Sequence, residues 1–241
     1  MASAAVRPRV TLKLATSLDG RIATASGESR WITGEAAREQ VHRLRAAHQA
    51  VMVGVETVIA DDPELTVRLE GFDGPQPARV VLDSRQRLPL ASRLVTGARR
   101  LPTIVVSTAP PRPELVEAGV AILTVAAQAG RVDPTAALAA LCRHITDAAV
   151  EAVAGLSPSL GGAAAWTPRV MIEGGGQVAA SFIAAGLVDA IEWFRAPIVL
   201  GDTGRPAVGG FVLDRLSDAP RFRRLAVEAC GDDLWERYER L

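Results

Sequence analysis

The sequence predicts an α/β protein with one mostly parallel central sheet, helices on both faces and an antiparallel C-terminal edge. Short runs of β-branched and apolar residues alternate with helical patterns along most of the chain, as expected for parallel strands joined by crossover helices. Residues 221–241 differ, because two β-like runs follow one another there without a helix between them. The chain has 241 residues and no internal repeat, so we expect one domain over residues 1–241.

The first half of the chain is expected to form strands and two helical segments. Thr33 is the expected N-cap of a helix that ends near His48, on an apolar i, i+3 pattern. Val55–Ala60 predicts a helical turn, which Pro63 ends. The predicted strands of this half are Val10–Ala15, Ala50–Gly54, Arg79–Asp83 and Thr103–Ser107.

The second half continues the alternation. Asp133 and Pro134 open a helix through about Val150, with the proline at the first helical position, where it is tolerated. A second helix of small and apolar residues ends at Gly186. Ala152–Pro168 is rich in Ala, Gly, Ser and Pro and contains no Lys or Arg, which predicts a flexible surface insertion. The predicted strands of this half are Val120–Val125, Arg169–Ile172 and Ala190–Val199.

Composition excludes several classes of function. Lys+Arg 27 balances Asp+Glu 27, and the charges are interspersed, so we expect no nucleic-acid partner. Cys142 and Cys230 form no CxxC pair, and with three histidines no zinc-ligand spacing arises, so we expect reduced structural thiols and no metal. The N-terminus has no apolar signal region, and no run of 18 apolar residues occurs, so we expect a cytoplasmic protein without a membrane association.

A long irregular segment, Ser17–Thr33, follows the first predicted strand. Loops in compact domains usually have about 2–6 residues, so this one is expected to bind something. Its Trp31 is suited to stack on a planar ring, although a lone Trp more often fills the core beneath a loop. Lys13, inside the first strand, would polarise a carbonyl if it faced a site, but it would have no catalytic role on the outer face of an edge strand.

Glycines follow Glu173 where a predicted strand meets a helix. Such glycines let backbone N–H groups approach a diphosphate at the positive end of the helix dipole. The sequence does not match GxGxxG, and no acidic residue follows at the dinucleotide-binding spacing. A glycine-rich turn without a ligand therefore remains an alternative.

Charged residues around a proline turn, in DDPELTVR at residues 61–68, form the next candidate group. The simpler alternative is a solvated loop with a capping Asp. Arg45 and Arg68 are candidates for binding a substrate phosphate, because Arg grips such oxygens bidentately; the alternative is that both are exposed surface charges. Ser84 and Arg85, at a strand end, offer a hydroxyl and a guanidinium that suit a ribose phosphate.

Six motifs in order and spacing resemble one family: VTLKLATSLDGRIAT, GESRWIT, HRLRAAHQAVMVG, TVIADDPELTVR, RVVLDSR and IEGGGQVAASFI. Together they are similar to the reductase domain of the bifunctional riboflavin-biosynthesis deaminase/reductase, strongly over Val10–Gly201 and loosely beyond. The resemblance implies a dihydrofolate-reductase-like fold, a homodimer, and reduction by NADPH of the ribosyl group of 5-amino-6-(5-phosphoribosylamino)uracil, or of its diamino-pyrimidinone analogue, to ribityl. The deaminase motifs HxE and PCxxC are absent from this sequence.

The resemblance also implies roles for individual residues. The implied cofactor contacts are Ala15, Trp31, Thr57, Asp61, Ser84, Gly175, Gly176, Gln177, Val178, Ala179, Ala180 and Ser181. The implied substrate contacts are Ser29, Arg45, Leu65, Arg68 and Glu173. Arg85, beside Ser84, is expected to favour NADPH over NADH.

The expected reaction needs orientation more than a nucleophile, since the nicotinamide carries the hydride. Asp61 is the candidate for proton management or for orienting the substrate, and Lys13 is a second polar group for the reacting centre. Two other functions stay open. One is a pterin or dihydrofolate-type reductase, against which Arg45 and Arg68 count because a pterin has no ribose phosphate. The other is a non-catalytic nucleotide-binding protein.

Overall fold

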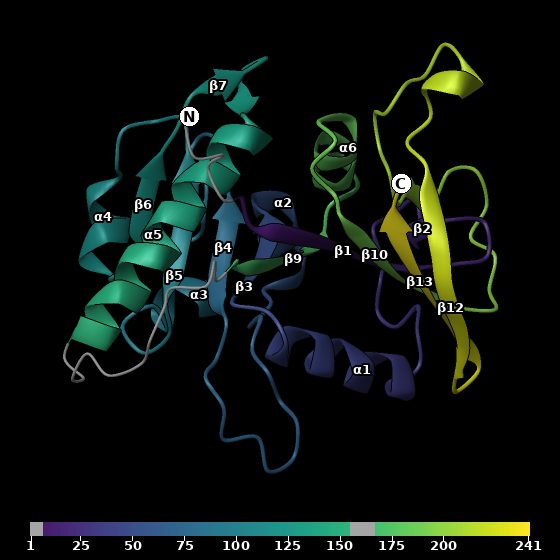
Figure 1. The fold of residues 1–241 in the computed structure, drawn as a ribbon, viewed down its shortest axis with the longest axis horizontal. Helices are drawn as coiled ribbons and strands as arrows, with labels where there is room; N and C mark the ends of the chain where they lie inside the picture. Colours follow the sequence, from purple (N-terminus) through teal and green to yellow (C-terminus); the bar gives the residue numbers. More distant parts are fainter. Residues whose placement is uncertain (1–6, 155–166) are drawn as a thin grey trace.

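The central feature of the computed structural model, which describes residues 7–154 and 167–241, is a nine-stranded sheet of order β12-β13-β10-β1-β9-β3-β4-β5-β6 (Figure 1). The strands from β10 to β6 in this order run parallel to one another, whereas β13 is antiparallel to β10 and β12 to β13. The predicted mostly parallel sheet with an antiparallel C-terminal edge is therefore confirmed. Its strands are β1 Arg9–Thr16, β3 Ala50–Gly54, β4 Ala78–Leu82, β5 Thr103–Ser107, β6 Ala121–Thr124, β9 Arg169–Gly174, β10 Ala190–Arg195, β12 Phe222–Cys230 and β13 Asp233–Arg240.

The chain begins in the middle of this sheet and winds outward in both directions. Helix α1 leads from β1 past the position of β9 to β3, and α2, α3 and α4 follow toward the β6 edge. Helix α5 then returns the chain to β9, and α6 leads on to β10. The helices are α1 Glu35–Ala46, α2 Val55–Asp61, α3 Arg93–Thr96, α4 Pro113–Glu117, α5 Pro134–Ala154, α6 Gly176–Ala184 and the 3-10 turn Leu216–Asp218. Two small ladders pair β2 Arg21–Ala23 with β11 Arg205–Pro206 and β7 Ala127–Gln128 with β8 Arg131–Val132.

Alternating strand residues build an apolar layer on each face of the sheet. Leu12 and Ile172 pack with Phe182 of α6 and with α5 on one face. Val51 and Met171 point the other way, into a cluster formed with α2, α3 and α4. Since side chains alternate across a strand, the residues next to Leu12 and Ile172, including Lys13 and Glu173, lie on this second face, which α1 also covers.

Neighbouring strands thus send the chain to opposite faces at their carboxyl ends. After β1 and β3 the chain enters α1 and α2 on one face, whereas after β9 it enters α6 on the other. The crevice outside such a switch point is where open α/β sheets bind ligands. A ligand site is therefore expected at the carboxyl ends of β1, β9, β3 and β4.

Some predicted boundaries differ from the structure. Gly34, and not Thr33, is the N-cap of α1, and its N–H donates to Asp233 Oδ2 at 2.7 Å. The strand predicted over Ala190–Val199 ends at Arg195, because Pro197 has no N–H to continue the ladder. Helix α5 continues beyond Val150 to Ala154, so the first residues of the predicted insertion are helical. Residues 155–166 of that insertion lie outside the described residues.

Candidate functional site

A buried ion pair joins α1 to the carboxyl end of β9. Arg45 Nε and Nη2 donate to Glu173 Oε1 and Oε2 at 2.5 and 2.7 Å, and the side chains are only 11% and 7% exposed. The remaining Arg45 nitrogen, Nη1, donates to the Thr66 carbonyl oxygen at 2.8 Å. Each terminal branch of this guanidinium is therefore already occupied, so in this conformation Arg45 orients Glu173 and Thr66.

Lys13 extends this row of charges. It lies on β1, between β10 and β9, so the alternative of an edge-strand lysine is wrong. Burial lowers the pKa of Lys13, Arg45 adds to that effect, and Glu173 opposes it. Burial alone would raise the pKa of Glu173, but the Arg45 and Lys13 charges outweigh burial and lower it. The site thus holds an ionised carboxylate beside an amine that releases its proton more readily than an ordinary lysine.

The two aspartates of DDPELTVR have separate surroundings. Asp62 Oδ1 accepts the N–H of Arg93 at 2.8 Å, at the start of α3, whose N-cap is Ser92. Asp61 ends α2, and its main-chain carbonyl accepts a hydrogen bond from the Arg30 guanidinium. Within the described part of the chain, no hydrogen bond or ion pair engages the Asp61 carboxylate, which leaves that group free for a ligand.

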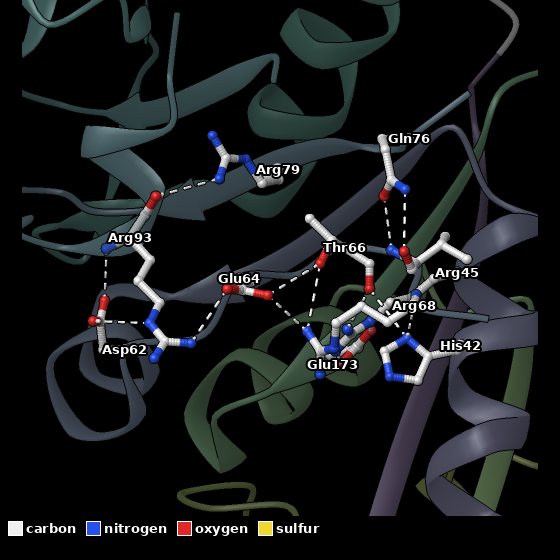
Figure 2. A network of polar contacts seen from close by, with 11 residues as sticks. His42, Arg45, Asp62, Glu64, Thr66, Arg68, Gln76, Arg79, Arg93 and Glu173 are labelled. Atoms are coloured by element: carbon white, nitrogen blue, oxygen red, sulfur yellow. Dashed lines mark hydrogen bonds and ion pairs between the residues drawn. The ribbon is translucent and has the colours of Figure 1, made fainter. Parts of the chain in front are cut away.

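Segment 64–68 presents Arg68 at the surface while Leu65 anchors it. The Leu65 side chain is 2% exposed and packs in the cluster of Val51 and Met171. Its φ of +56° is unfavourable for a bulky residue. Because the Leu65 side chain is buried, any contact of this residue with a substrate would use its backbone. Figure 2 shows the Arg68 side chain beside Glu64, with Nη1 3.1 Å from Glu64 Oε2.

Three glycines form the turn between β9 and α6, and two of them are required by different features of the structure. Gly175 has φ +87°, a conformation that side chains disfavour. At Gly176 an added Cβ would overlap the carbonyl oxygen of Pro206, and Gly209 N donates to Gly176 O at 2.9 Å. Packing therefore explains Gly176 without a ligand. No side chain among the described residues caps α6, so its first-turn N–H groups remain available to an anion.

The other residues implied around this turn differ in accessibility. Thr57, on α2, lies beside the turn, with Oγ1 3.7 Å from a Cβ built on Gly175. Ala179 and Ala180 are buried, so they offer only backbone atoms to a ligand. Gln177 Oε1 accepts from Arg131 at 2.7 Å. Half-buried Val178 lies against Gly54, and the Ser181 hydroxyl donates to the Val178 carbonyl at 2.9 Å.

Ser84 and Arg85 lie just beyond the carboxyl end of β4. Ser84 Oγ accepts the N–H of Val132 at 3.0 Å, so this hydroxyl is partly used in holding β8. Arg85 is exposed, and no ion pair or hydrogen bond holds it in residues 7–154 and 167–241. The structure therefore offers an unpaired cation at this strand end.

The segment after β1 carries the remaining candidates. Trp31 is 70% exposed, with the Arg38 guanidinium 4.5 Å from its ring centre, so the alternative of a core-filling Trp is wrong. Ser29 is half-buried, and its carbonyl accepts from Ile32 N at 3.2 Å. Ala15 is half-buried on the same face of β1 as Lys13.

The structure brings the substrate candidates Arg45 and Glu173 together with the catalytic candidate Lys13, and the Arg68 segment is bonded to Arg45 through Thr66. A cavity lies elsewhere, at the amino ends of β1 and β9, and is lined by Arg7, Arg9, Arg169 and Asp189 among others. The described residues contain no group of three or more His, Cys, Asp or Glu able to hold a metal ion. None of their helices is long and apolar enough to cross a membrane.

Sequence reasoning missed two residues of this network. His42 Nδ1 lies 3.1 Å from the Thr66 carbonyl oxygen and accepts the Arg68 N–H at 3.2 Å. Gln76 contacts Val67 on the same segment. The i, i+3 spacing from His42 to Arg45 was a usable signal, since it places both side chains on one side of α1. Gln76 has no comparable signal in the sequence.

Comparisons with known proteins agree on one family. The family model described as the RibD C-terminal domain matches residues 8–163 and 163–235. The riboflavin biosynthesis protein RibD of Actinobacillus pleuropneumoniae is 32% identical over 232 residues, which are 95% of this chain and 56% of the relative. The 2,5-diamino-6-ribosylamino-4(3H)-pyrimidinone 5′-phosphate reductase of Methanothermobacter thermautotrophicus is 35% identical over 97% of this chain and 98% of its own length.

A solved structure gives the same result. RibD of Acinetobacter baumannii superposes with a TM-score of 0.80 at 33% identity, over 98% of this chain and 58% of that one. The chain therefore spans just over half the length of these RibD relatives and nearly all of the M. thermautotrophicus reductase.

Proposed function

We propose that the chain, which belongs to the RibD C-terminal domain family, is an NADPH-dependent reductase of riboflavin biosynthesis. Its substrate is 5-amino-6-(5-phosphoribosylamino)uracil or the diamino-pyrimidinone analogue, and its product carries ribityl in place of ribosyl. The observation that carries this proposal is the buried pair of Glu173 and Arg45, with half-buried Lys13 beside it, at the carboxyl ends of β1 and β9. Buried charges cost stability, and perturbed groups of this kind concentrate at functional sites.

The residues present fit a dinucleotide phosphate. The first turn of α6 offers N–H groups without a side-chain cap in the described chain, and Thr57 lies beside it. Arg85 is an exposed, unpaired cation at the end of β4, suited to a 2′-phosphate. When bound, NADPH supplies the hydride. Further contacts come from Ala15, Trp31 and the backbone of residues 175–181.

The chain's own residues hold the substrate and handle a proton. Arg68 binds the ribose 5-phosphate, and Glu173, held by Arg45, accepts hydrogen bonds from sugar hydroxyls. Ser29 and the backbone of Leu65 complete the substrate contacts. Lys13 is a candidate to deliver a proton to the sugar-bearing nitrogen, because burial lowers its pKa. Asp61, whose carboxylate is unengaged in the described chain, is the candidate to orient the substrate or to relay a proton to the reacting centre.

The test is NADPH oxidation followed by absorbance, with the phosphorylated uracil, the diamino-pyrimidinone and dihydrofolate offered side by side. Turnover of a phosphorylated pyrimidine alone is expected, and turnover of dihydrofolate alone would replace this proposal with a pterin reductase. NADH is expected to be the poorer cofactor. Arg85→Ala should narrow that preference by about 1–2 kcal/mol, the value of one charge-assisted contact.

The proposal extends to a homodimer. Strand β12 is an edge of the sheet, and its Leu225 and Val227 are 55% and 43% exposed. Long edge strands with exposed apolar residues need to be paired or covered, and a second copy of this chain offers a self-complementary edge. Sedimentation at micromolar concentration should therefore give a mass about twice the 25.4 kDa of the chain. A single species of monomer mass would contradict the dimer.

A further inference from the structure

We infer that His42 is a positioning residue: its unprotonated Nδ1 holds the backbone of Arg68 and so sets where the Arg68 guanidinium meets the substrate phosphate. The inference rests on the proposed function of Arg68. Its structural part, that His42 holds the segment, stands on the contacts alone.

Segment 66–68 is held from two sides. On one side Val67 N donates to Gln76 Oε1 at 2.7 Å, and Gln76 Nε2 donates to Val67 O at 3.1 Å. On the other side, Figure 2 shows His42 and Arg45 reaching from α1 toward Thr66 and Arg68. With three residues anchored in this way, the start of the Arg68 side chain has little freedom, although its guanidinium is exposed.

The contacts select one form of the His42 ring. Nδ1 lies 3.2 Å from the Arg68 nitrogen and 3.1 Å from the Thr66 oxygen, and one ring nitrogen cannot both accept from the first and donate to the second. The Thr66 oxygen already accepts from Arg45 at 2.8 Å, whereas no other acceptor serves the Arg68 N–H within residues 7–154 and 167–241. The neutral ring with its proton on Nε2 therefore gives the Arg68 N–H its acceptor, while the Thr66 oxygen keeps Arg45 as its donor.

The charges around His42 favour the same form. Arg45 on α1 and Arg68 on the segment are cations close to the ring, while Glu173 on β9 is the nearby anion. Burial first, then Arg45 and Arg68, lowers the pKa of His42. The ring is thus neutral at neutral pH, and Nδ1 is free to accept the Arg68 N–H.

Two substitutions separate this role from simple packing. The amide of His42→Asn lies where Nδ1 lies and keeps an acceptor for Arg68, whereas the amide of His42→Gln reaches the Nε2 position and leaves the Arg68 N–H without one. Gln40→Ala is the matched control, since Gln40 lies on the same helix and its side chain accepts only from Arg43, at 2.9 Å, in the structure described.

The first measurement is amide hydrogen exchange of Arg68 by NMR, without any ligand. Exchange should accelerate about 3- to 10-fold in His42→Gln, the range for one lost hydrogen bond, and return toward the parent value in His42→Asn.

The second measurement is the KM for phosphorylated and dephosphorylated substrate. His42→Gln should raise the KM for the phosphorylated substrate about 3- to 10-fold, with a much smaller change in kcat, and should add little to the loss caused by Arg68→Ala. Unchanged Arg68 exchange in His42→Gln would overturn the structural role. Faster exchange with an unchanged KM, while Arg68→Ala raises it, would overturn the effect on substrate binding. If Arg68→Ala itself leaves the KM unchanged, the proposed role of Arg68 fails, and the exchange measurement still decides whether His42 holds the segment.

Discussion

Two carboxylate–arginine groups lie in one polar network, and they differ in almost every physical respect (Figure 2). Glu173 and Arg45 form a buried bidentate pair between β9 and α1. Glu64 lies at the surface and is shared by Arg68 at 3.1 Å and Arg93 at 3.3 Å, with single contacts to each. The buried pair fixes geometry, because both Glu173 oxygens are hydrogen-bonded to the same Arg45 guanidinium. The surface group holds a cation that a ligand can take over, since exposed pairs are worth only about 0–1 kcal/mol.

The largest effect should follow from breaking the buried pair. Glu173→Gln keeps the shape but leaves Arg45 buried without a carboxylate, which should lower the free energy of unfolding by about 3–5 kcal/mol. Urea unfolding measures it, and Glu64→Gln, which removes a surface carboxylate from the same network, should cost less than about 0.5 kcal/mol. A loss for Glu173→Gln as small as that of a surface pair would contradict the distinction between the two groups.

The second largest effect is expected on substrate binding, with little change in the stability of the fold. Arg68→Ala should raise the KM for the phosphorylated substrate and lower kcat/KM about 10- to 150-fold, as a charge-assisted contact of about 1.5–3 kcal/mol predicts. NADPH affinity and the free energy of unfolding should change little, because the side chain is exposed. Dephosphorylated substrate should lose a similar amount with the parent protein and little more with the variant. Additive losses would mean that Arg68 acts elsewhere.

The third effect uses pH to probe the scaffold behind the buried pair. His48 Nδ1 donates to the Leu44 carbonyl at 2.6 Å, and the Thr11 hydroxyl donates to Nε2 at 2.9 Å, so the neutral ring ties α1 to β1. Burial is the main cause that lowers the pKa of His48, as it is for His42. Below the ordinary value of 6.5 the unfolded chain therefore binds more protons than the folded one, and stability falls as pH falls toward the folded-state pKa values.

The expected slope is at most about 1.4 kcal/mol per pH unit for each histidine. Urea unfolding at several pH values between neutral and the ordinary carboxylate range measures it. His48→Gln, which cannot titrate, should reduce the slope in this window. A parent protein whose stability rises as pH falls from 7 would refute the assignment.

The smallest effect is expected from a change to the surface carboxylate Glu64. Glu64→Gln removes the carboxylate that competes with substrate phosphate for Arg68, so the KM for phosphorylated substrate should fall, by at most about fivefold for a contact of 1 kcal/mol or less. Glu114→Gln is a suitable control, because Glu114 pairs with Arg112 far along the chain, at 3.3 Å. A raised KM in Glu64→Gln would show that Glu64 orients Arg68 and does not compete for it.

Much of the fold could be predicted from the sequence because strands and helices carry local patterns. The run Ala50–Gly54 is apolar throughout and forms a fully buried strand, and the position of Pro134 marks the start of α5. Local patterns do not predict a structural feature that depends on a residue far away in the sequence. Gly34 caps α1 because Asp233, in the last strand, accepts its N–H, and no spacing near residue 34 signals that contact.

The candidate site, like the fold, could be predicted only in part from the sequence. Glu173, Arg45 and Arg68 were predicted as substrate residues from motifs, but the motifs could not show that Arg45 is bound to Glu173, since those residues are far apart in the chain. The glycine run indicated a phosphate turn, whereas Gly176 is also required by the approach of Pro206. Leu65 carries no sequence signal for its positive φ, because tertiary packing imposes that conformation on it.

The position of β9 has a consequence for how the protein is made. Strand β9 lies between β1 and β3, yet it is synthesised after β6, so β1 and the group β3 to β6 emerge from the ribosome before the strand that lies between them. The joining strand also brings Glu173, which means that the proposed substrate site cannot form until the ribosome has moved past this residue. Pairings between distant parallel strands form slowly and leave apolar edges uncovered meanwhile. A growing chain of this protein therefore stays inactive and vulnerable to aggregation until β9 is inserted.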